Sequence, residues 1–132
     1  MRSAPTPIDL IGLIGNTPMV KVTQLDTGPC ELFLKLESHN PGGSIKDRIG
    51  LSMISAAEQA GQLGPHQRHL IEATAGNTGL GLALVSSQKG YRLTLVIPDK
   101  MSQEKVRLLK AFGAEVIVTP TAVPPDHPDN YV

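Results

Sequence analysis

Short apolar runs alternate with segments of helical period in the second half of the sequence. Residues 69–73, 92–98 and 114–118 are apolar runs of the length of buried strands. Between them, residues 80–89 and 103–112 carry Leu, Ala and Val at the spacing of a helix face. Strands that alternate with helices of this length are typical of a parallel sheet. The pattern predicts a β-α-β-α-β unit in a three-layer α/β fold, with helices flanking a parallel sheet.

The first third of the sequence predicts a different arrangement of short elements and turns. Residues 19–22 and 31–37 are expected strands, because they are short apolar segments bounded by turn residues. Residues 8–11 are expected to form one helical turn that ends at Gly12.

Residues 46–60 carry apolar side chains at helical spacing, and this predicted helix begins with a lysine. We expect Ser44 to cap it with support from Asp47, and Gly61 to end it. The positive end of a helix dipole disfavours an ammonium group, so the position favours the neutral amine that forms Schiff bases. The alternative is a solvated Lys46 paired with a nearby charge such as Asp47, and position alone favours this alternative.

A second candidate site lies at residues 74–79, where a predicted strand runs into a glycine turn and then a helix. Such a turn can present backbone N–H groups to a carboxylate or a phosphate. Asn77 and Thr78 would add side-chain donors. An ordinary turn capped by Asn77 or Thr78 explains the same residues equally well.

A partial dinucleotide fingerprint overlaps this turn and makes nucleotide binding a weaker alternative. Gly79 and Gly81 begin it, and Asp99 follows about 20 residues later, near the end of a predicted strand. Leu84 occupies the position of the third glycine, however, and the first two glycines would lie inside the helix rather than in the turn.

Composition narrows the classes of function. The 132 residues include 12 basic and 12 acidic side chains, so the chain lacks the positive charge that favours nucleic acids and membrane surfaces. No apolar run reaches the ~18 residues of a membrane span, and residues 1–7 lack the apolar core of a secretory signal. The single cysteine, Cys30, is expected to be a half-buried filler. We expect a cytoplasmic protein with neither a nucleic-acid nor a membrane partner.

Glycine, proline and histidine refine this picture. The 13 Gly and 11 Pro residues lie mostly at the ends of predicted elements before residue 119, whereas four prolines between residues 120 and 128 predict an extended tail. No metal site is predicted, because none of the histidines has the spacing of a metal ligand. They are His39, His66, His69 and His127.

Five motifs stand out in order along the chain. They are residues 14–18 (IGNTP), 35–48 (KLESHNPGGSIKDR), 76–79 (GNTG), 98–102 (PDKMS) and 113–116 (GAEV). Together they resemble the cysteine synthase and cystathionine β-synthase family of fold type II pyridoxal-phosphate enzymes. The form of the lysine motif resembles the β-replacement branch more than the dehydratases. The AGNTG and PDKMS stretches look closer to bacterial cystathionine β-synthases than to cysteine synthases.

The resemblance implies the N-terminal part of the tryptophan-synthase-β-like fold and pyridoxal 5′-phosphate as the cofactor. It implies that Lys46 forms a Schiff base with the cofactor and that Asn77 hydrogen-bonds the cofactor's ring hydroxyl. Lys46 would later remove the substrate's α proton, with the cofactor as electron sink. The β substituent of serine or an O-acylated serine would leave, and homocysteine or sulfide would add, giving cystathionine or cysteine. The loop that holds the substrate carboxylate would comprise Thr74, Ala75, Gly76 and Thr78.

Two features depart from the family. Ala75 stands where most relatives have serine, which removes a hydrogen-bond donor of about 0.5–1.5 kcal/mol and leaves the substrate open. No glycine-rich loop for the cofactor phosphate follows Val118, although family members carry one in a second domain. We therefore expect residues 1–43 to belong partly with a missing large domain, 44–118 to form a small mobile domain and 119–132 to be an extended tail or a truncated end.

The resemblance also implies a homodimer for the full-length enzyme. For the isolated chain we expect weak cofactor retention and little activity, because the phosphate anchor is absent. A non-catalytic truncated fragment or interaction module is the main alternative.

Overall fold

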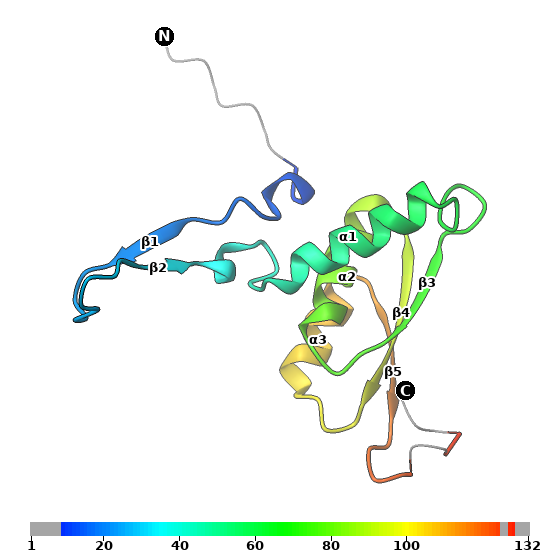
Figure 1. Cartoon of the computed structure of the whole chain (residues 1–132). Helices are drawn as coiled ribbons and strands as arrows, with labels where there is room; N and C mark the ends of the chain where they lie inside the picture. Colours follow the sequence, from blue (N-terminus) through cyan, green and yellow to red (C-terminus); the bar gives the residue numbers. More distant parts are fainter. Residues whose placement is uncertain (1–8, 125–126, 129–132) are drawn as a thin grey trace.

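A β-hairpin and a parallel sheet with its helices make up the described part of this computed structural model, residues 9–124 and 127–128 (Figure 1). The predicted turn at residues 8–11 and the tail at 119–132 lie partly outside these residues. The hairpin pairs two antiparallel strands, β1 (Met19–Val22) and β2 (Leu32–Lys35). Short 3-10 turns precede and follow it, η1 (Ile11–Leu13) and η2 (Glu37–His39).

The parallel sheet confirms the predicted α/β class. Its strands lie in the order β3 (His69–Ala73), β4 (Arg92–Pro98) and β5 (Glu115–Thr119). The helices are α1 (Lys46–Gln59), α2 (Asn77–Lys89) and α3 (Gln103–Ala111). Both β-α-β crossovers run between adjacent parallel strands, and right-handed crossovers place α2 and α3 on the same face of the sheet. This gives a helical layer over one face, as Figure 1 shows.

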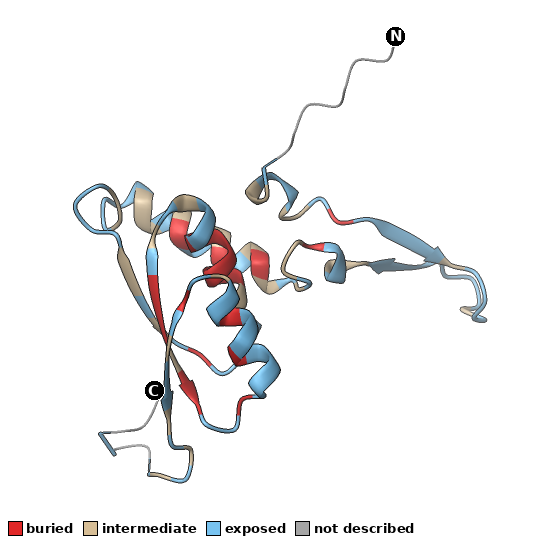
Figure 2. Cartoon of the chain, turned by 180° about the vertical axis from the view of Figure 1, so that it is seen from behind, coloured by how far each residue is buried: buried red, intermediate tan, exposed pale blue. Residues whose placement is uncertain are grey.

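The core lies between that helical layer and the central strand. Leu93, Leu95 and Ile97 alternate along β4, and all three are at most 2% exposed. They meet an apolar α2, in which every residue from Leu82 to Val85 is buried (Figure 2). This alternation toward one face is the reason that the 92–98 run forms a strand rather than a helix.

Two glycines let α1 pack closely on α2. A side-chain carbon added to Gly50 would overlap the backbone of Gly81, and one added to Gly81 would overlap the carbonyl oxygen of Lys46. Only residues without a side chain allow two helix backbones to come this close. The contact places the first turn of α1 against α2.

The opposite face of the sheet is open in the described residues. Ile71 on β3 is 67% exposed and Ile117 on β5 is 47% exposed. A second helical layer on that face is not found among residues 9–124. No helix in the described ranges has the length and apolarity needed to cross a bilayer.

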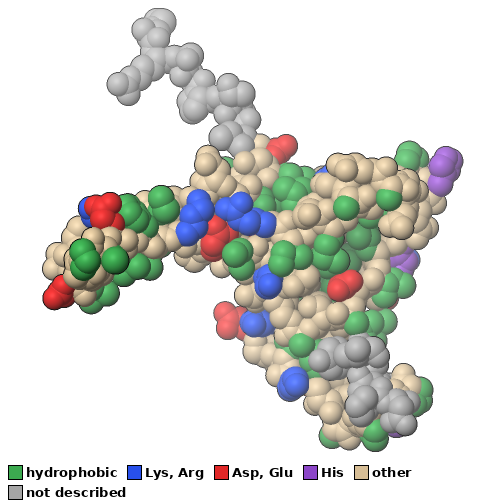
Figure 3. Space-filling model, in the orientation of Figure 1, with side chains coloured by type: hydrophobic (Ala, Val, Ile, Leu, Met, Phe, Trp, Pro, Cys, Tyr) green, Lys and Arg blue, Asp and Glu red, His purple; other side chains and the backbone are tan. Residues whose placement is uncertain are grey.

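The hairpin differs from the rest of the chain in its burial. It extends from the helical unit (Figure 1), and all four residues of β2 are exposed. Hydrophobic side chains gather along its visible surface (Figure 3). Cys30, expected to be half-buried, is exposed here, because the turn around it packs on no other element.

The predicted boundaries hold closely, with two corrections at helix starts. β1, β3 and β4 have the predicted bounds. α2 begins at Asn77 rather than residue 80, so half of the predicted 74–79 turn is helical. At α1 the N-cap residue is Ile45, which makes no side-chain cap, so the expected Ser44 cap is wrong.

Candidate functional site

Lys46 opens α1 and is partly buried. Its backbone N–H donates to the Ser44 hydroxyl at 3.2 Å, so Ser44 shapes the entry to the helix from one residue before the cap position. Among the described residues, no hydrogen bond or ion pair reaches the Lys46 amine. The expected alternative of a lysine paired with Asp47 is therefore wrong.

The Asp47 carboxylate is buried in the protein. The residue is 0% exposed, and its Oδ2 accepts the Gly42 N–H at 2.5 Å. Its other oxygen, Oδ1, has no hydrogen-bond partner. Burial raises the pKa of Asp47, and the hydrogen bond from Gly42 opposes that shift. Asp47 thus holds the preceding glycine turn in place.

Thr74 directly follows β3 and shapes the loop after the strand. Its N–H donates to the Val96 carbonyl at 3.0 Å, and its hydroxyl accepts the Gly76 N–H at 3.3 Å. Its methyl group fills the space beside Gly79, where an added side-chain carbon would lie 2.6 Å away. The buried Thr74 therefore supports the loop, while Ala75 and Gly76 are exposed at its tip.

The first turn of α2 is uncapped. Gly76 is the N-cap residue and makes no side-chain cap, so the expected alternative of a turn capped by Asn77 or Thr78 is wrong. The first turn also contains no acidic residue. Backbone N–H groups at an uncapped helix start lack intrahelical partners, and the helix dipole favours an anion there. The loop and this turn together can receive a carboxylate or a phosphate.

The two sites predicted from sequence are joined in the structure. The Asn77 side-chain amide donates to the Ser44 hydroxyl at 3.3 Å. The Lys46 carbonyl lies against Gly81, one turn further along α2. The backbone of Lys46 and the uncapped start of α2 are therefore neighbours, and the Ser44 hydroxyl bridges the two helices.

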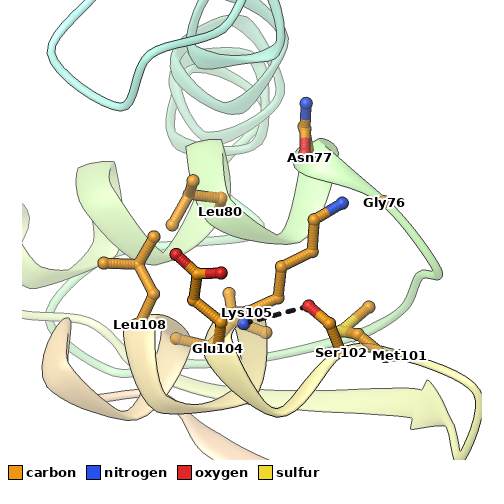
Figure 4. Close-up of a pocket in the computed structure, with 9 residues that line it drawn as sticks. Gly76, Asn77, Leu80, Met101, Ser102, Glu104, Lys105 and Leu108 are labelled. Carbon is orange, nitrogen blue, oxygen red and sulfur yellow. Dashed lines mark hydrogen bonds between the residues drawn. The ribbon is translucent and has the colours of Figure 1, made fainter.

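A cavity of about 260 Å³ opens beside this junction. It lies between the start of α2 and the start of α3, and the Lys105 side chain extends toward Gly76 and Asn77 (Figure 4). Ser102 caps α3 by accepting the Lys105 N–H at 3.4 Å. A neighbouring hollow includes Ala75 and Lys105. The exposed loop tip therefore faces open space that a small molecule can enter.

The sequence did not predict a polar cluster around Glu37, which comprises Glu37, Arg48, Thr17 and Asn40. The Arg48 guanidinium donates to both carboxylate oxygens of Glu37, from Nε at 2.9 Å and from Nη2 at 3.0 Å. Thr17 and Asn40 donate to the same carboxylate at 2.6 and 2.9 Å. These hydrogen bonds, led by Arg48, lower the pKa of Glu37 to about 2. The only sequence signal was that Glu37 and Arg48 fall in one motif.

The structure also bears on the nucleotide alternative. Gly79 and Gly81 are buried inside α2, as expected, and the added side-chain positions meet Thr74 and Lys46 rather than open space. Asp99, the acidic residue of the fingerprint, accepts the Thr121 N–H at 3.2 Å and so holds the chain after β5. These residues perform packing roles. Within the described ranges, no three His, Cys, Asp or Glu residues gather as a metal site.

Comparison with known proteins finds one family. The model of "Pyridoxal-phosphate dependent enzyme" matches residues 10–131. Cystathionine beta-synthase of Saccharomyces cerevisiae is 49% identical over 99% of this chain, and that of Mus musculus is 50% identical over 94% of it. The chain spans only 26% and 22% of the length of those two relatives.

Two solved structures share the fold over most of the chain. A hydrogen sulfide-producing enzyme from Fusobacterium nucleatum superposes with a TM-score of 0.82 at 47% identity, over 91% of this chain and 39% of that one. An O-ureido-L-serine synthase superposes with a TM-score of 0.83 at 35% identity, over 92% of this chain and 38% of that one. The expected fold family is confirmed by these superpositions.

Proposed function

Because this chain belongs to the pyridoxal-phosphate-dependent enzymes, with pyridoxal 5′-phosphate as the cofactor, we propose that it serves β-replacement in sulfur amino-acid metabolism. The donor is serine or an O-acylated serine, and the acceptor is homocysteine or sulfide. The relatives named cystathionine beta-synthase and the hydrogen sulfide-producing enzyme support this class of chemistry. The whole reaction is a proposal, since the chain spans about a quarter of the curated relatives.

One observation carries the proposal. The Lys46 amine, which has no hydrogen-bond or ion-pair partner within residues 9–124, belongs to a helix turn that is tied to the start of α2 by the hydrogen bond between Ser44 and Asn77. A lysine amine is the group that attaches to the aldehyde of this cofactor, and the adjacent uncapped helix start suits an anion. The Lys46 amine and the N–H groups at the start of α2 fit the cofactor and its amino-acid substrate. The first turn of α2 contains no acidic side chain that would compete for these N–H groups.

Each residue then has a proposed part. Lys46 would hold the cofactor and, once released by the substrate amine, accept the proton from the substrate's α carbon. Asn77 would hydrogen-bond the ring hydroxyl of the cofactor. When bound, the cofactor supplies an electron sink that makes this proton acidic. The substrate carboxylate would be bound by Thr74, Ala75, Gly76 and Thr78, of which Thr74 also supports the loop from below.

Ala75 bears on the choice of substrate. It is exposed at the loop tip and offers no hydroxyl, so the carboxylate would depend on backbone N–H groups at this point. We expect Ala75→Ser to add one donor and to tighten amino-acid binding up to about tenfold, given about 0.5–1.5 kcal/mol for a neutral hydrogen bond. Calorimetric titration with serine and with O-acetylserine, in the presence of cofactor, would rank the two donors.

The cofactor spectrum tests the proposal directly. Pyridoxal phosphate is added to the protein, the visible absorbance is recorded, and borohydride reduction followed by peptide mass spectrometry locates the modified lysine. We expect a band and a modified Lys46. Lys46→Ala should abolish both, whereas Lys110→Ala, at the exposed end of α3, should leave both unchanged.

This experiment and a thermal-unfolding measurement with NAD separate the alternative functions. No band and no preferential modification of Lys46 would support a non-catalytic fragment or interaction module. Thermal stabilisation by NAD without a response to pyridoxal phosphate would support nucleotide binding instead. We further propose a cytoplasmic location, on the composition, and a homodimer with residues 1–43 packing partly on a large domain, as the family resemblance implies. Sedimentation of the full-length protein would test the dimer.

A further inference from the structure

The start of α1 is fixed by side chains that reach backward along the chain. The N-cap residue provides no side-chain cap, and the Lys46 amine makes no hydrogen bond or ion pair in the described residues. The two residues that follow it, Asp47 and Arg48, both bind the segment at 37–42. Asp47 and Arg48, rather than a helix cap, therefore tie the first helical turn to the preceding segment, in addition to the packing of α1 on α2.

Arg48 is tied to the preceding segment by a bidentate ion pair with Glu37. Nε and Nη2 of Arg48 donate to the two carboxylate oxygens of Glu37 at 2.9 and 3.0 Å. Planar forked pairing fixes the orientation of both groups as well as their distance. The Glu37 side chain is only 19% exposed, so solvent competes for it little.

Two buried residues hold Glu37 from behind. Thr17 is 6% exposed and donates to Glu37 at 2.6 Å. Asn40 is 3% exposed, donates to Glu37 at 2.9 Å and accepts the Gly15 N–H at 2.8 Å. Hydrogen bonds from Thr17, before the hairpin, and Asn40, after it, thus fix the Glu37 carboxylate in addition to the ion pair with Arg48.

The Asp47 tether acts beside the first. Its carboxylate accepts the Gly42 N–H at 2.5 Å, and a side chain at Gly42 would overlap it. Consecutive helical residues point about 100° apart around the helix axis, since 3.6 residues make one turn. Tethers at positions 47 and 48 therefore resist both rotation and sliding of the turn that carries Lys46.

We propose that Glu37, acting through Arg48, is a positioning residue for the Lys46 amine. This inference rests on the proposed function, in which Lys46 holds the cofactor. Its role is to keep the first turn of α1, which carries Lys46, in its observed orientation against the start of α2. A small misorientation of a reacting group can reduce its reactivity by one to two orders of magnitude.

Glu37→Gln and Arg48→Lys test the proposal with little change in volume. Each protein is incubated with a limiting amount of pyridoxal phosphate, reduced with borohydride and digested, and the modification of Lys46 is measured relative to all other lysines. We expect the selectivity for Lys46 to fall about tenfold in both variants. We also expect weaker circular dichroism of the cofactor band per cofactor bound, which reports how rigidly the attachment is oriented.

A second Arg–Glu pair supplies the matched control. Arg92 and Glu115 lie 2.9 Å apart on the sheet, where their side chains are 68% and 51% exposed. Arg92→Lys and Glu115→Gln should leave both readouts unchanged. Thermal unfolding of all four variants identifies any that fails to fold, and Glu37→Asp, which keeps the charge, should recover part of the selectivity.

The outcomes separate the two proposals. Loss of selectivity in folded Glu37→Gln and Arg48→Lys, with the controls unchanged, supports the positioning role. Undiminished selectivity and dichroism in those variants overturn it and leave the proposed function intact. No preference for Lys46 in the unaltered protein overturns the proposed function, and the positioning role with it. Equal losses in the control variants assign the effect to general stability and also overturn the inference.

Discussion

The hairpin and the helical sheet use similar apolar side chains but bury them very differently. Leu34 in β2 is 49% exposed, whereas Leu95 in β4 is 0% exposed. Burial of apolar surface is the main favourable contribution to folding. The stability of the described chain therefore resides in residues 44–119, and the hairpin contributes through its root, where Glu37 meets Arg48.

The largest expected effect contrasts one leucine from each region. Leu95→Ala should lower the free energy of unfolding by about 2–5 kcal/mol, because it leaves a cavity between β4 and α2. Leu34→Ala should change it by no more than about 0.5 kcal/mol, because the side chain is already half in water. Urea unfolding of both variants measures the difference, and comparable losses would show that the hairpin is packed in solution.

A smaller effect tests the contact between α1 and α2. Gly81→Ala should destabilise the protein by about 1–3 kcal/mol, because the added carbon overlaps the Lys46 carbonyl. Gly64→Ala is the matched control, since nothing lies within 4 Å of its added carbon. Thermal unfolding compares the two. An unchanged stability of Gly81→Ala would mean that α1 and α2 separate easily. It would contradict the close contact that brings the first turn of α1 to the start of α2.

The difference between the regions also explains what sequence could predict. The strands β1, β3 and β4 have the predicted bounds, because local alternation and turn residues determine strand ends. The β-α-β-α-β order followed from the same local patterns. The start of α2 was misplaced by three residues, because Asn77 and Thr78 are typical of turns and only the packing of Gly79 against Thr74 shows that they are helical.

The candidate site was predictable in its parts but not in its assembly. Lys46 and the 74–78 loop were recognised from motifs. The Glu37 cluster was not, because its members lie 3 to 31 positions apart along the chain and follow no period. Which side chains meet across a hairpin root depends on tertiary packing, and no local pattern encodes it. The same is true of the cavity beside Lys105.

The helix starts offer a third, more moderate test. α3 has a side-chain cap from Ser102, whereas α1 has none. Ser102→Ala should cost about 1 kcal/mol of unfolding free energy, and Ser102→Thr should retain most of it. Ile45→Asp should give no comparable gain, because Ile45 has helical backbone angles (φ −56°, ψ −21°) rather than the extended ones of a capping residue. Chemical unfolding ranks the three variants, and an unaffected Ser102→Ala would show that the cap contributes nothing in solution.

The smallest expected effect is the loss of stability in acid that comes from Glu37 and Arg48, at the base of the hairpin. The pKa of Glu37 is lowered from 4.5 to about 2 by Arg48, Thr17 and Asn40. A depressed carboxyl pKa stabilises the folded state above the unfolded value, and this contribution is lost as the pH falls from about 4.5 toward about 2. Asp47 acts with the opposite sign, because its raised pKa favours the folded state on protonation.

Thermal midpoints of the unaltered protein and of Glu37→Gln between pH 7 and pH 3 isolate the Glu37 contribution. The two should differ most at neutral pH and converge in acid, since Gln cannot titrate. Glu115→Gln is the control for an exposed pair, where solvent screens the interaction, and it should shift the curve less. If the thermal midpoints of Glu37→Gln and of the unaltered protein changed in parallel with pH, Arg48 would not stabilise the Glu37 charge in solution. The Glu37 cluster would then support the first turn of α1 by packing rather than by charge.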